Sequence, residues 1–555
     1  MNAAEPRASG SRAYTLLLLF ISGMGGLLYG YDVGIIGAAL LYLAKTINLT
    51  LAQESWIVAA VTGGGMFSSL VAGIFADKIG RKKVMIAAAL LFIASVLLIV
   101  TAKGFLPLFL GRALQGLSAG MIAVVIPLYL AECLPAGLRG RGTATFQLIL
   151  TIGIMIALAV GAHYTRIVGA ADARDKGLLA VAQDHAWRAM FFSAAYPAVL
   201  FLGGSFLVSE SPRWLFRRGR REQAMAALRR SRTPAEAELE FEEMDRLSSA
   251  RDNGRAGSGG SVFQRRYLVP FFLACAVLGL TQATGVNSIL QFLVVILQQA
   301  GLGAAAAAGK ATAVTVVNVV FTVVGLLLVD KLGRRALLMI GTAGITVALS
   351  VSALAFHRFE SGRADVTDLA RSRVADRSLA LAADASSLGL PPSVSPGQLL
   401  VLYTQGGEER LASAFGNDPD PVVRIPADPA GRPLAIRRAR FGQAPGAGTG
   451  NLVMGCLMLF IASFATGPGV CVWLALSELM PTRIRSLGMG LGLLINQFVS
   501  TGIAALFLPF VGNFGYAAIF GFWAACTLAY FLVAALLLPE TKGKTLEEIE
   551  AVFSD

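Results

Sequence analysis

The sequence predicts an all-α membrane protein whose twelve transmembrane helices form two similar six-helix halves. Of its 555 residues, 55% are hydrophobic and only 15% are charged. The mean hydropathy is +0.66, which excludes both an ordinary soluble protein and a disordered chain. Hydrophobic stretches long enough to cross a bilayer as helices recur along the chain, and the motifs beside them occur twice in the same order.

Twelve stretches are predicted to span the membrane, so the lipid bilayer is the first partner that the sequence implies. The first stretch is too long, and too poor in small residues at its end, to be a removable signal peptide, so both termini are expected to remain attached. The predicted spans are residues 14–43, 55–76, 84–102, 105–130, 142–163, 188–208, 267–300, 307–329, 336–356, 451–476, 486–511 and 515–538.

Charge placement predicts the topology. Thirteen arginines lie between Arg213 and Arg266, and basic clusters fill the short loops 78–83 and 331–335. Loops rich in Lys and Arg stay in the cytoplasm, so both termini are expected there too. The net charge of +13 therefore reflects topology, and no nucleic-acid partner is expected. The five cysteines show no metal-type spacing, so neither a disulfide framework nor a metal site is indicated.

Three motifs reveal an internal duplication. Residues 77–82 read DKIGRK, and residues 330–335 read DKLGRR. A glutamate with an arginine seven residues later follows in each half, at Glu132 and at Glu478. A third, weaker pair is Glu210 after the sixth span and Glu540 after the twelfth. Repetition of the three motifs in one order indicates a duplicated six-helix unit.

The repeat also locates two insertions. Asp77 and Glu132 are 55 residues apart, whereas Asp330 and Glu478 are 148 apart, so the second half carries 93 extra residues. These are assigned to 357–449, outside the membrane between spans nine and ten. This insert has eleven arginines, ten acids and no long apolar run. We expect it to be mostly disordered, the alternative being a small module with a strand at 397–403.

Two further segments complete the organisation. A 16-residue insertion in the first half is assigned to 166–183, between spans five and six. A helix is predicted at about 233–249 in the linker between the halves. The predicted parts are a cytoplasmic N-terminus (1–13), the N-terminal bundle (14–208), a cytoplasmic linker (209–266), helices seven to nine (267–356), the extracytoplasmic insert (357–449), helices ten to twelve (450–538) and a cytoplasmic tail (539–555).

Asp32 is the most informative single residue, because it lies inside the first hydrophobic stretch. A carboxylate at that depth costs several kcal/mol unless it faces a cavity, finds a partner or binds a proton, so it marks an ion or substrate path. The alternative is an acid that reaches back to a helix end.

The motifs together resemble the sugar porter family of the major facilitator superfamily. The resemblance covers nearly the whole chain except the two outer insertions and the first dozen residues. It is carried by Gly30-Tyr31-Asp32, Gly73, Asp77, Gly80-Arg81-Lys82, Gly111-Arg112, Glu132, Arg139-Gly140-Arg141, residues 209–215 (SESPRWL), Gln282, Gly285, Asn287, Asp330, Gly333-Arg334-Arg335, Gly467-Pro468-Gly469, Trp473 and residues 539–543 (PETKG).

The resemblance implies a major facilitator fold and a secondary transporter that moves a sugar or polyol by alternating access. An Asp at position 32 is typical of proton-coupled members, so a proton is the expected co-substrate and Arg112 the implied partner of Asp32. A cytoplasmic gate is implied as well, because charged helix ends of both signs can lock and release two bundles. Its implied members are Asp77, Gly80, Arg81, Glu132, Arg139, Arg141, Glu210, Arg213, Asp330, Gly333, Arg334, Arg335, Glu478, Arg485 and Glu540. The alternative, loops that are basic only for topology, leaves the paired acids unexplained.

Amide side chains suit a sugar site, because each donates and accepts at once, and an aromatic face can stack on the sugar ring. Gln282, Asn287 and Gln291 recur at intervals of four or five and so lie roughly along one helix face. By resemblance the site residues are Tyr29, Gln282, Asn287, Gln291, Asn318, Trp473 and Asn496. The alternatives are hydrogen bonds between helices for the amides and an interfacial position for the tryptophan.

The sequence also departs from the family. Thr281, Ile154 and Gly492-Leu493 stand where the family commonly has a Gln, a Gln and an Asn-Trp pair, and Gln291-Phe292 replaces an aromatic pair. Several sugar contacts are therefore missing or moved. A polyhydroxyl substrate is still expected, but glucose and xylose cannot be assumed, and Gln291 could serve a polyol such as an inositol.

Other functions fit less well. A facilitative sugar uniporter is the nearest alternative, and a non-transporting sugar sensor would share the same motifs. An enzyme is not expected, since the chain has only three histidines and no phosphate-binding loop. No cofactor is implied, and a functional monomer in a bacterial inner membrane is expected.

Overall fold

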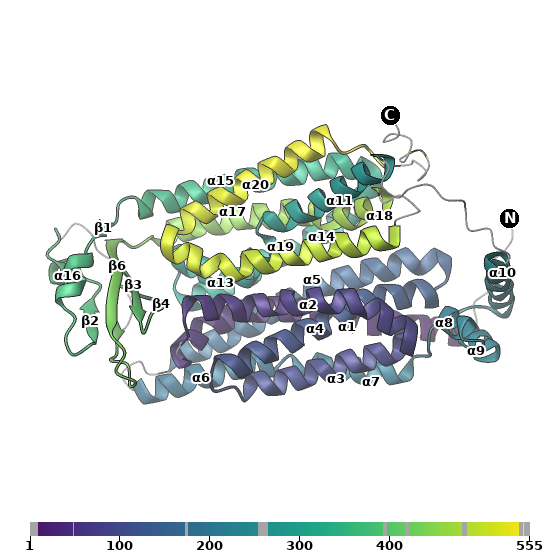
Figure 1. Ribbon diagram of the computed structural model, residues 1–555, viewed down its shortest axis with the longest axis horizontal. Coiled ribbons are helices and arrows are strands. Elements are labelled where there is room, and N and C mark those ends of the chain that lie inside the picture. The colour runs from purple at the N-terminus through teal and green to yellow at the C-terminus, as the bar shows by residue number, and fades with distance from the viewer. Residues whose placement is uncertain are drawn as a thin grey trace.

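The computed structural model describes residues 9–47, 49–171, 176–252, 265–391, 397–416, 421–479, 485–542 and 548. Within these residues, twelve helical segments are long and apolar enough to cross a membrane. The predicted helical membrane fold with twelve spans is therefore confirmed, although the described part of the insert adds six strands and the chain is not all-α. The spans run roughly parallel and form two halves that lie alongside each other (Figure 1).

Six spans build the N-terminal half. The sixth is interrupted at residues 193–194, where α6 ends and α7 begins. The helices are α1 (Ser9–Thr46), α2 (Leu51–Ile79), α3 (Arg81–Val100), α4 (Phe105–Cys133), α5 (Ala136–Ala170), α6 (Lys176–Phe192) and α7 (Ala195–Leu207).

The C-terminal half repeats this plan with two broken spans. Span seven is divided into three pieces, and span ten is interrupted at Gly467 before Pro468, which cannot continue a regular helix. The helices are α11 (Arg265–Ala283), α12 (Val286–Gln291), α13 (Leu293–Gln299), α14 (Ala304–Leu332), α15 (Arg334–Glu360), α17 (Ala447–Thr466), α18 (Pro468–Leu479), α19 (Arg485–Phe514) and α20 (Tyr516–Leu536).

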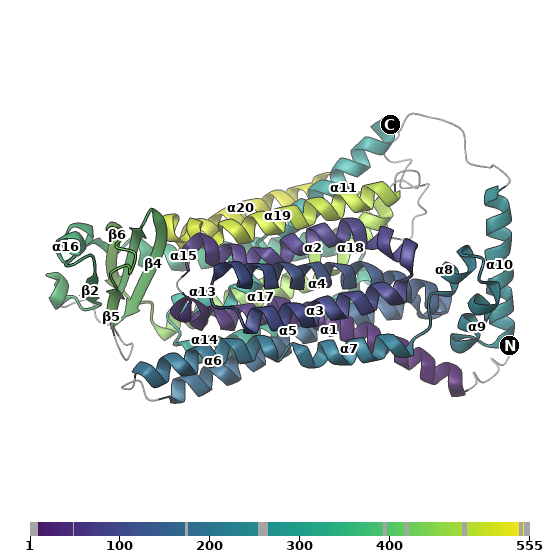
Figure 2. The ribbon, with the colours of Figure 1, turned by 60° about the horizontal axis from the view of Figure 1, so that its bottom comes forward.

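The two ends of the bundle differ. Three short helices between the halves lie at one end, called the linker end here, and the insert lies at the opposite end, called the insert end (Figures 1 and 2). The third linker helix covers the stretch 233–249 that was predicted to be helical. The linker helices are α8 (Pro212–Arg217), α9 (Arg221–Ser231) and α10 (Pro234–Asp252).

The insert is folded, so the expectation of a mostly disordered segment was wrong, and the alternative with a strand at 397–403 is the better description. Its core is formed by buried side chains from segments that are far apart in the sequence, such as Leu399 from one segment and Ala439 and Phe441 from another. A four-stranded antiparallel sheet has the order β1-β6-β3-β4, and β2 pairs with β5. The elements are β1 (Ala364–Asp365), α16 (Thr367–Ser372), β2 (Leu379–Ala382), a 3-10 turn (Ser386–Leu388), β3 (Gly397–Gln405), β4 (Glu408–Phe415), β5 (Val422–Ile425) and β6 (Leu434–Gln443).

The smaller insertion, assigned to residues 166–183, adds helix rather than loop. Helix α5 continues to Ala170 and α6 begins at Lys176. The first half therefore gains its extra length by extending spans five and six at the insert end.

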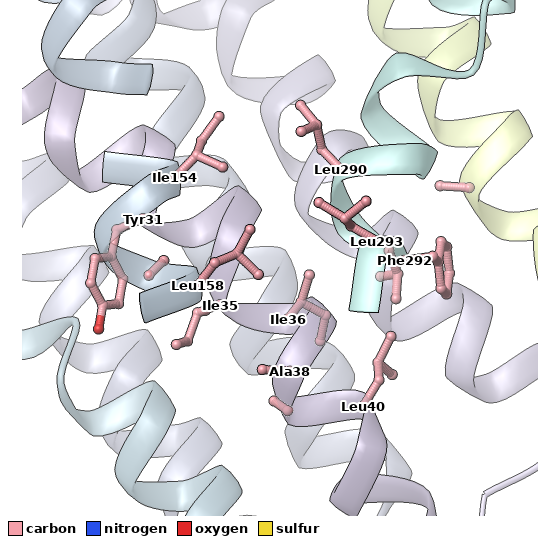
Figure 3. Packing of buried hydrophobic residues seen from close by; sticks show 14 of the residues in the cluster. Tyr31, Ile35, Ile36, Ala38, Leu40, Ile154, Leu158, Leu290, Phe292 and Leu293 are labelled. Atoms are coloured by element: carbon pink, nitrogen blue, oxygen red, sulfur yellow. The ribbon is translucent and has the colours of Figure 1, made fainter. Parts of the chain in front are cut away.

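The outer surface of the bundle is apolar, as a bilayer requires. Large hydrophobic side chains such as Phe67, Leu327 and Leu536 are more than half exposed. Inside, α1 packs between α5 and the broken span seven, with Ile36 and Leu40 on the side of Leu290 and Leu293 (Figure 3). Apolar side chains thus face both lipid and core, and the few polar ones inside the bundle stand out.

The two halves contact each other in the part of the bundle nearer the insert end. The Ser55 hydroxyl accepts a hydrogen bond from the Leu508 amide at 3.0 Å, and the hydroxyls of Thr62 and Thr501 are 3.1 Å apart. Gly37 of α1 approaches the backbone carbonyl of Gln291 so closely that a Cβ atom would lie 2.9 Å from its oxygen. Toward the linker end the halves diverge (Figure 2).

Replacing Phe441 by Ala is predicted to open the insert to protease. Its ring is 1% exposed in the insert core, and such a truncation costs about 3–5 kcal/mol. Trypsin should then cut at the insert's arginines faster than in the native protein, whereas Leu411→Ala, at a side chain that is 36% exposed, should not change the rate. Equal cleavage of the native and Phe441→Ala proteins would contradict a folded insert.

Candidate functional site

Close contact between α1 and α5 positions Asp32. The glycines at 26, 30 and 34 share one face of α1, and α5 lies directly against that face. A Cβ atom at Gly30 would lie 1.9 Å from the carbonyl oxygen of Leu150, and one at Gly34 would lie 2.7 Å from that of Ile154. Small residues at every fourth position allow two membrane helices to approach this closely. Asp32 is two residues from both Gly30 and Gly34, so its side chain points away from α5 and toward α4.

Arg112 of α4 is the partner of Asp32. Its Nη1 donates to Asp32 Oδ1 at 2.5 Å and to Gln115 Oε1 at 2.8 Å. The two charged side chains are 0% and 1% exposed, and the guanidinium carbon lies 5.5 Å from the centre of the Phe191 ring. The structure therefore brings together the two residues proposed for proton coupling, remote from lipid.

This buried pair is incompletely bonded. Among the described residues, Asp32 Oδ2, Arg112 Nε and Nη2, and Gln115 Nε2 have no hydrogen-bond partner. Buried polar atoms without a partner are costly and uncommon in folded proteins, and they concentrate at functional sites.

A cluster of amides lies across the bundle in the C-terminal half. Asn287 Nδ2 donates to Gln282 Oε1 at 3.0 Å and to Ser500 Oγ at 2.9 Å. Gln282 Nε2 donates to Asn496 Oδ1 at 3.2 Å, and Asn496 Nδ2 donates to the backbone oxygen of Leu278 at 3.1 Å. The break in span seven makes this geometry possible, because Gly285 adopts φ +81° between α11 and α12.

Three other predicted site residues lie in different surroundings. Gln291 is 0% exposed, and neither amide atom has a partner among the described residues. Tyr29 lies close to Gln497 of α19, so this tyrosine faces the second half. Asn318 is buried on α14, and no hydrogen bond is described between its side chain and the amide cluster.

Two residues of this region were not predicted from the sequence. Ser500 accepts a hydrogen bond from Asn287 of the amide cluster, and Gln497 lies close to Tyr29. Asn496 was predicted from the family resemblance, and the adjacent Gln497, an amide in the same apolar span, was not. Ser500 lies one helical turn after Asn496, so the spacing of four could have indicated a shared face. Trp473 lies in α18, but its side chain is outside the described part of the chain.

At the linker end of the first half, the predicted gate residues form a compact cluster. Arg81, which is 1% exposed, lies 2.8 Å from Asp77 and 2.9 Å from Glu132. Ser211 Oγ donates to Glu132 at 2.5 Å. Glu210 accepts the backbone N–H groups of Arg81 and Lys82 at 2.8 and 3.2 Å. These two N–H groups begin α3, where no earlier turn of helix can bond them, so Glu210 serves as an external cap.

The second half repeats this capping. Glu540 accepts the backbone N–H groups of Arg334 and Arg335 at 3.0 and 3.1 Å at the start of α15. The preceding glycines match as well, with φ +100° at Gly80 and +87° at Gly333. These hydrogen bonds and ion pairs each stay within one half of the protein.

Arg213, another predicted gate residue, lies 3.8 Å from Glu240 of α10 rather than against a membrane helix. Arg217, which was not predicted, lies 3.3 Å from Glu132. The remaining side chains fall outside the described part of the chain, although their backbones lie in helices. They are Arg139, Arg141, Asp330, Glu478 and Arg485.

Comparison with known proteins decides the family. The family model described as "Sugar (and other) transporter" matches residues 18–367 and 435–553, which is more than half of the chain. The chain belongs to this sugar transporter family. It is a transporter of the sugar porter type and not an enzyme.

The transporter has relatives along almost its full length. It is 27% identical over 536 residues to the probable metabolite transport protein CsbC of Bacillus subtilis, covering 96% of this chain and 94% of the relative. It is also 27% identical to the human proton myo-inositol cotransporter, covering 98% and 82%. The inward-open structure of the xylose transporter XylE from E. coli has a TM-score of 0.68 at 21% identity, covering 97% and 99%, and shares the fold.

Gly80→Ala is predicted to destabilise the transporter. Its φ of +100° and ψ of 158° suit only glycine, and a Cβ atom would lie 2.2 Å from Glu210 Oε2. Strain of this kind costs about 1–3 kcal/mol, so the melting temperature in detergent should fall. Gly73→Ala in the same helix, where nothing lies within 4 Å of the new carbon, should leave the melting temperature unchanged or raise it. The same loss in both variants would refute the capping role of Glu210.

Proposed function

We propose that this transporter moves a sugar or polyol by alternating access and couples that movement to a proton. The observation that carries the proposal is the buried Asp32–Arg112 pair at 2.5 Å, placed in one half while the amide cluster lies in the other. A titratable group inside a membrane bundle is a functional site by default. Tyr29, three residues before Asp32 on α1, connects the two regions through Gln497.

Alternating access is supported by where the halves meet. Contacts between Ser55 and Leu508 and between Thr62 and Thr501 join the halves nearer the insert end. At the linker end, the described hydrogen bonds of Glu210 and Glu540 each stay within one half. The two halves can therefore rotate against each other if a few contacts break at the insert end and the charged clusters form new contacts at the linker end.

Proton coupling follows from the incomplete bonding of the pair. An ionised Asp32 attracts Arg112, whereas a neutral one releases it, so protonation changes how tightly α1 and α4 are connected. Because Tyr29 lies on the same helix as Asp32 and contacts the second half, a change at α1 would reach the substrate region. Protonation of Asp32 would then permit the loaded transporter to change state.

A polyhydroxyl substrate is supported by the chemistry of the amides. Asn287, Gln282 and Asn496 each carry a donor and an acceptor, which match a hydroxyl group. The relatives named as a glucose transporter, from Staphylococcus epidermidis, and as a proton myo-inositol cotransporter point to the same class. Gln291 adds an unpaired amide close to the break in span seven.

The proposed orientation places the linker end in the cytoplasm. Basic residues gather there, in the loops 78–83 and 331–335 and on α8 and α9, and loops rich in Lys and Arg remain on the cytoplasmic side. Both termini are then cytoplasmic, in the inner membrane of a bacterium. One chain supplies both halves of the site, so a monomer suffices.

Asp32→Asn is predicted to abolish accumulation driven by a pH gradient but to retain exchange. The amide preserves the shape of the side chain but cannot carry a proton. The measurement is uptake of radiolabelled D-glucose, D-xylose and myo-inositol into proteoliposomes, with and without a pH gradient. A facilitative uniporter would show equal exchange and no accumulation in either protein.

The matched control is Asp184→Asn. Asp184 also pairs with an arginine, Arg188, at 2.8 Å, but near the insert end of α6 and 43% exposed. Accumulation should survive this change. Accumulation that survives in Asp32→Asn as well would rule out coupling through Asp32.

Gln291→Leu is predicted to separate binding from stability. The amide has no partner among the described residues, so an apolar side chain of similar size should keep or raise the melting temperature. The rise in melting temperature caused by a bound sugar or polyol should shrink, because a ligand contact is lost. Asn287→Ala should lower both the melting temperature and its rise on ligand binding, because Asn287 also donates hydrogen bonds to Gln282 and Ser500. An unchanged ligand response in Gln291→Leu would exclude Gln291 from the site.

A further inference from the structure

The insert sheet has two buried faces, because strand β3 presents alternate side chains to different neighbours. Leu399 and Val401 lie in the core of the insert. Leu402 belongs instead to the core of the membrane bundle, and Gln398 donates to Gln299 of α13 at 2.9 Å. Successive residues of a strand point to opposite faces. One face of β3 therefore packs within the insert and the other packs on the transporter.

Two described hydrogen bonds attach the insert to the C-terminal half. Besides the bond from Gln398 to Gln299, Arg438 Nη1 donates to the backbone oxygen of Asn513 in α19 at 2.9 Å. Within the insert, Arg363 Nη2 also donates to Gln398 at 2.8 Å. At the end of α15, Glu360 accepts the first N–H groups of α20, from Tyr516 and Ala517, at 2.7 and 3.1 Å. The insert also begins and ends on spans of this half, so it is built onto that half.

A smaller contact reaches the N-terminal half at the start of α2. Leu51, the first residue of α2, and Leu402 both lie within 4 Å of the position that a Cβ atom would take at Gly512. Burial raises the pKa of the Tyr403 hydroxyl, Arg410 lowers it, and the charge of Glu54 in the first turn of α2 adds to the rise. Strand β4 also packs near α2. The insert thus bridges the two halves where they meet.

The insert is also an addition to the family fold. The family model stops at residue 367 and resumes at 435, so most of the insert is absent from the shared pattern. The shared pattern therefore does not account for this module, and its position where the two halves meet calls for a role beyond that pattern.

We infer that the insert is a lid, carried by the C-terminal half, that holds the insert end closed through the packing of Leu402 and strand β4 near the start of α2. The inference rests on the proposed alternating-access function. When the insert end opens, α2 and α19 must separate, and the lid must leave Leu51 while it keeps its bonds to Gln299 and Asn513. Its apolar contact with α2 would therefore favour the state that is open toward the linker end.

The test joins the insert covalently to one half or to the other. In a background whose five native cysteines are replaced by alanine, one protein carries Leu51→Cys with Leu402→Cys, and a matched control carries Gln299→Cys with Gln398→Cys. The same short bifunctional maleimide is applied to both. Uptake of radiolabelled D-glucose, D-xylose and myo-inositol is measured before and after cross-linking, together with hydrogen exchange of the segments 51–65 and 497–512.

Cross-linking residues 51 and 402 is expected to reduce uptake at least tenfold and to slow hydrogen exchange in both segments. Cross-linking 299 and 398 should change neither by more than about twofold. The lid proposal would be overturned if the 51–402 cross-link left hydrogen exchange and uptake unchanged, or if the 299–398 cross-link reduced uptake equally. If neither protein takes up any of the three probes before cross-linking, the proposed substrate class fails, and hydrogen exchange alone still decides the lid.

Discussion

The structure depends on keeping one carboxylate and one guanidinium inside a bundle that lipid surrounds. Asp32 and Arg112 satisfy each other only through one oxygen and one nitrogen, and a buried pair that loses either partner costs about 3–5 kcal/mol. The contact of α1 with α5 through glycine supplies the close packing that makes this burial feasible. Around this pair, the interior can remain polar where a hydroxylated solute would bind, while the outer surface stays apolar.

The proposed alternating access adds a second constraint, namely that each half moves as a unit. The same device secures helix starts in three places: Glu210 caps α3, Glu540 caps α15 and Glu360 caps α20, each by accepting backbone N–H groups after a glycine with positive φ. Helices α15 and α20 are thus joined at both ends, once through Glu540 and once through Glu360. Under the proposed mechanism, rigid pairs of this kind would let a half rotate as one body rather than bend locally.

Much of this organisation could be predicted from the sequence because membrane helices and duplicated motifs leave strong local patterns. The twelve spans and the repeat follow from hydropathy and order. The expectation of a single amide face on span seven was wrong, because the chain breaks at Gly285. Gln291 lies apart from the bonded pair of Gln282 and Asn287. The insert could not be predicted well, because its core forms from short strands far apart in sequence, such as those containing Leu399 and Phe441. The partners Gln497 and Ser500 depend on how α19 faces α1 and α12, and Arg217 reaches Glu132 only because α8 turns back under α4.

The central claim is that a proton travels with the solute through the pair in the first half. The most direct measurement is the transient current that follows a jump in sugar or polyol concentration on proteoliposomes adsorbed to a solid-supported membrane, with no pH gradient. Symport of a neutral solute with a proton predicts a positive inward current that disappears when Asp32 is replaced by Asn. Solute uptake without any current in the native protein would contradict the account.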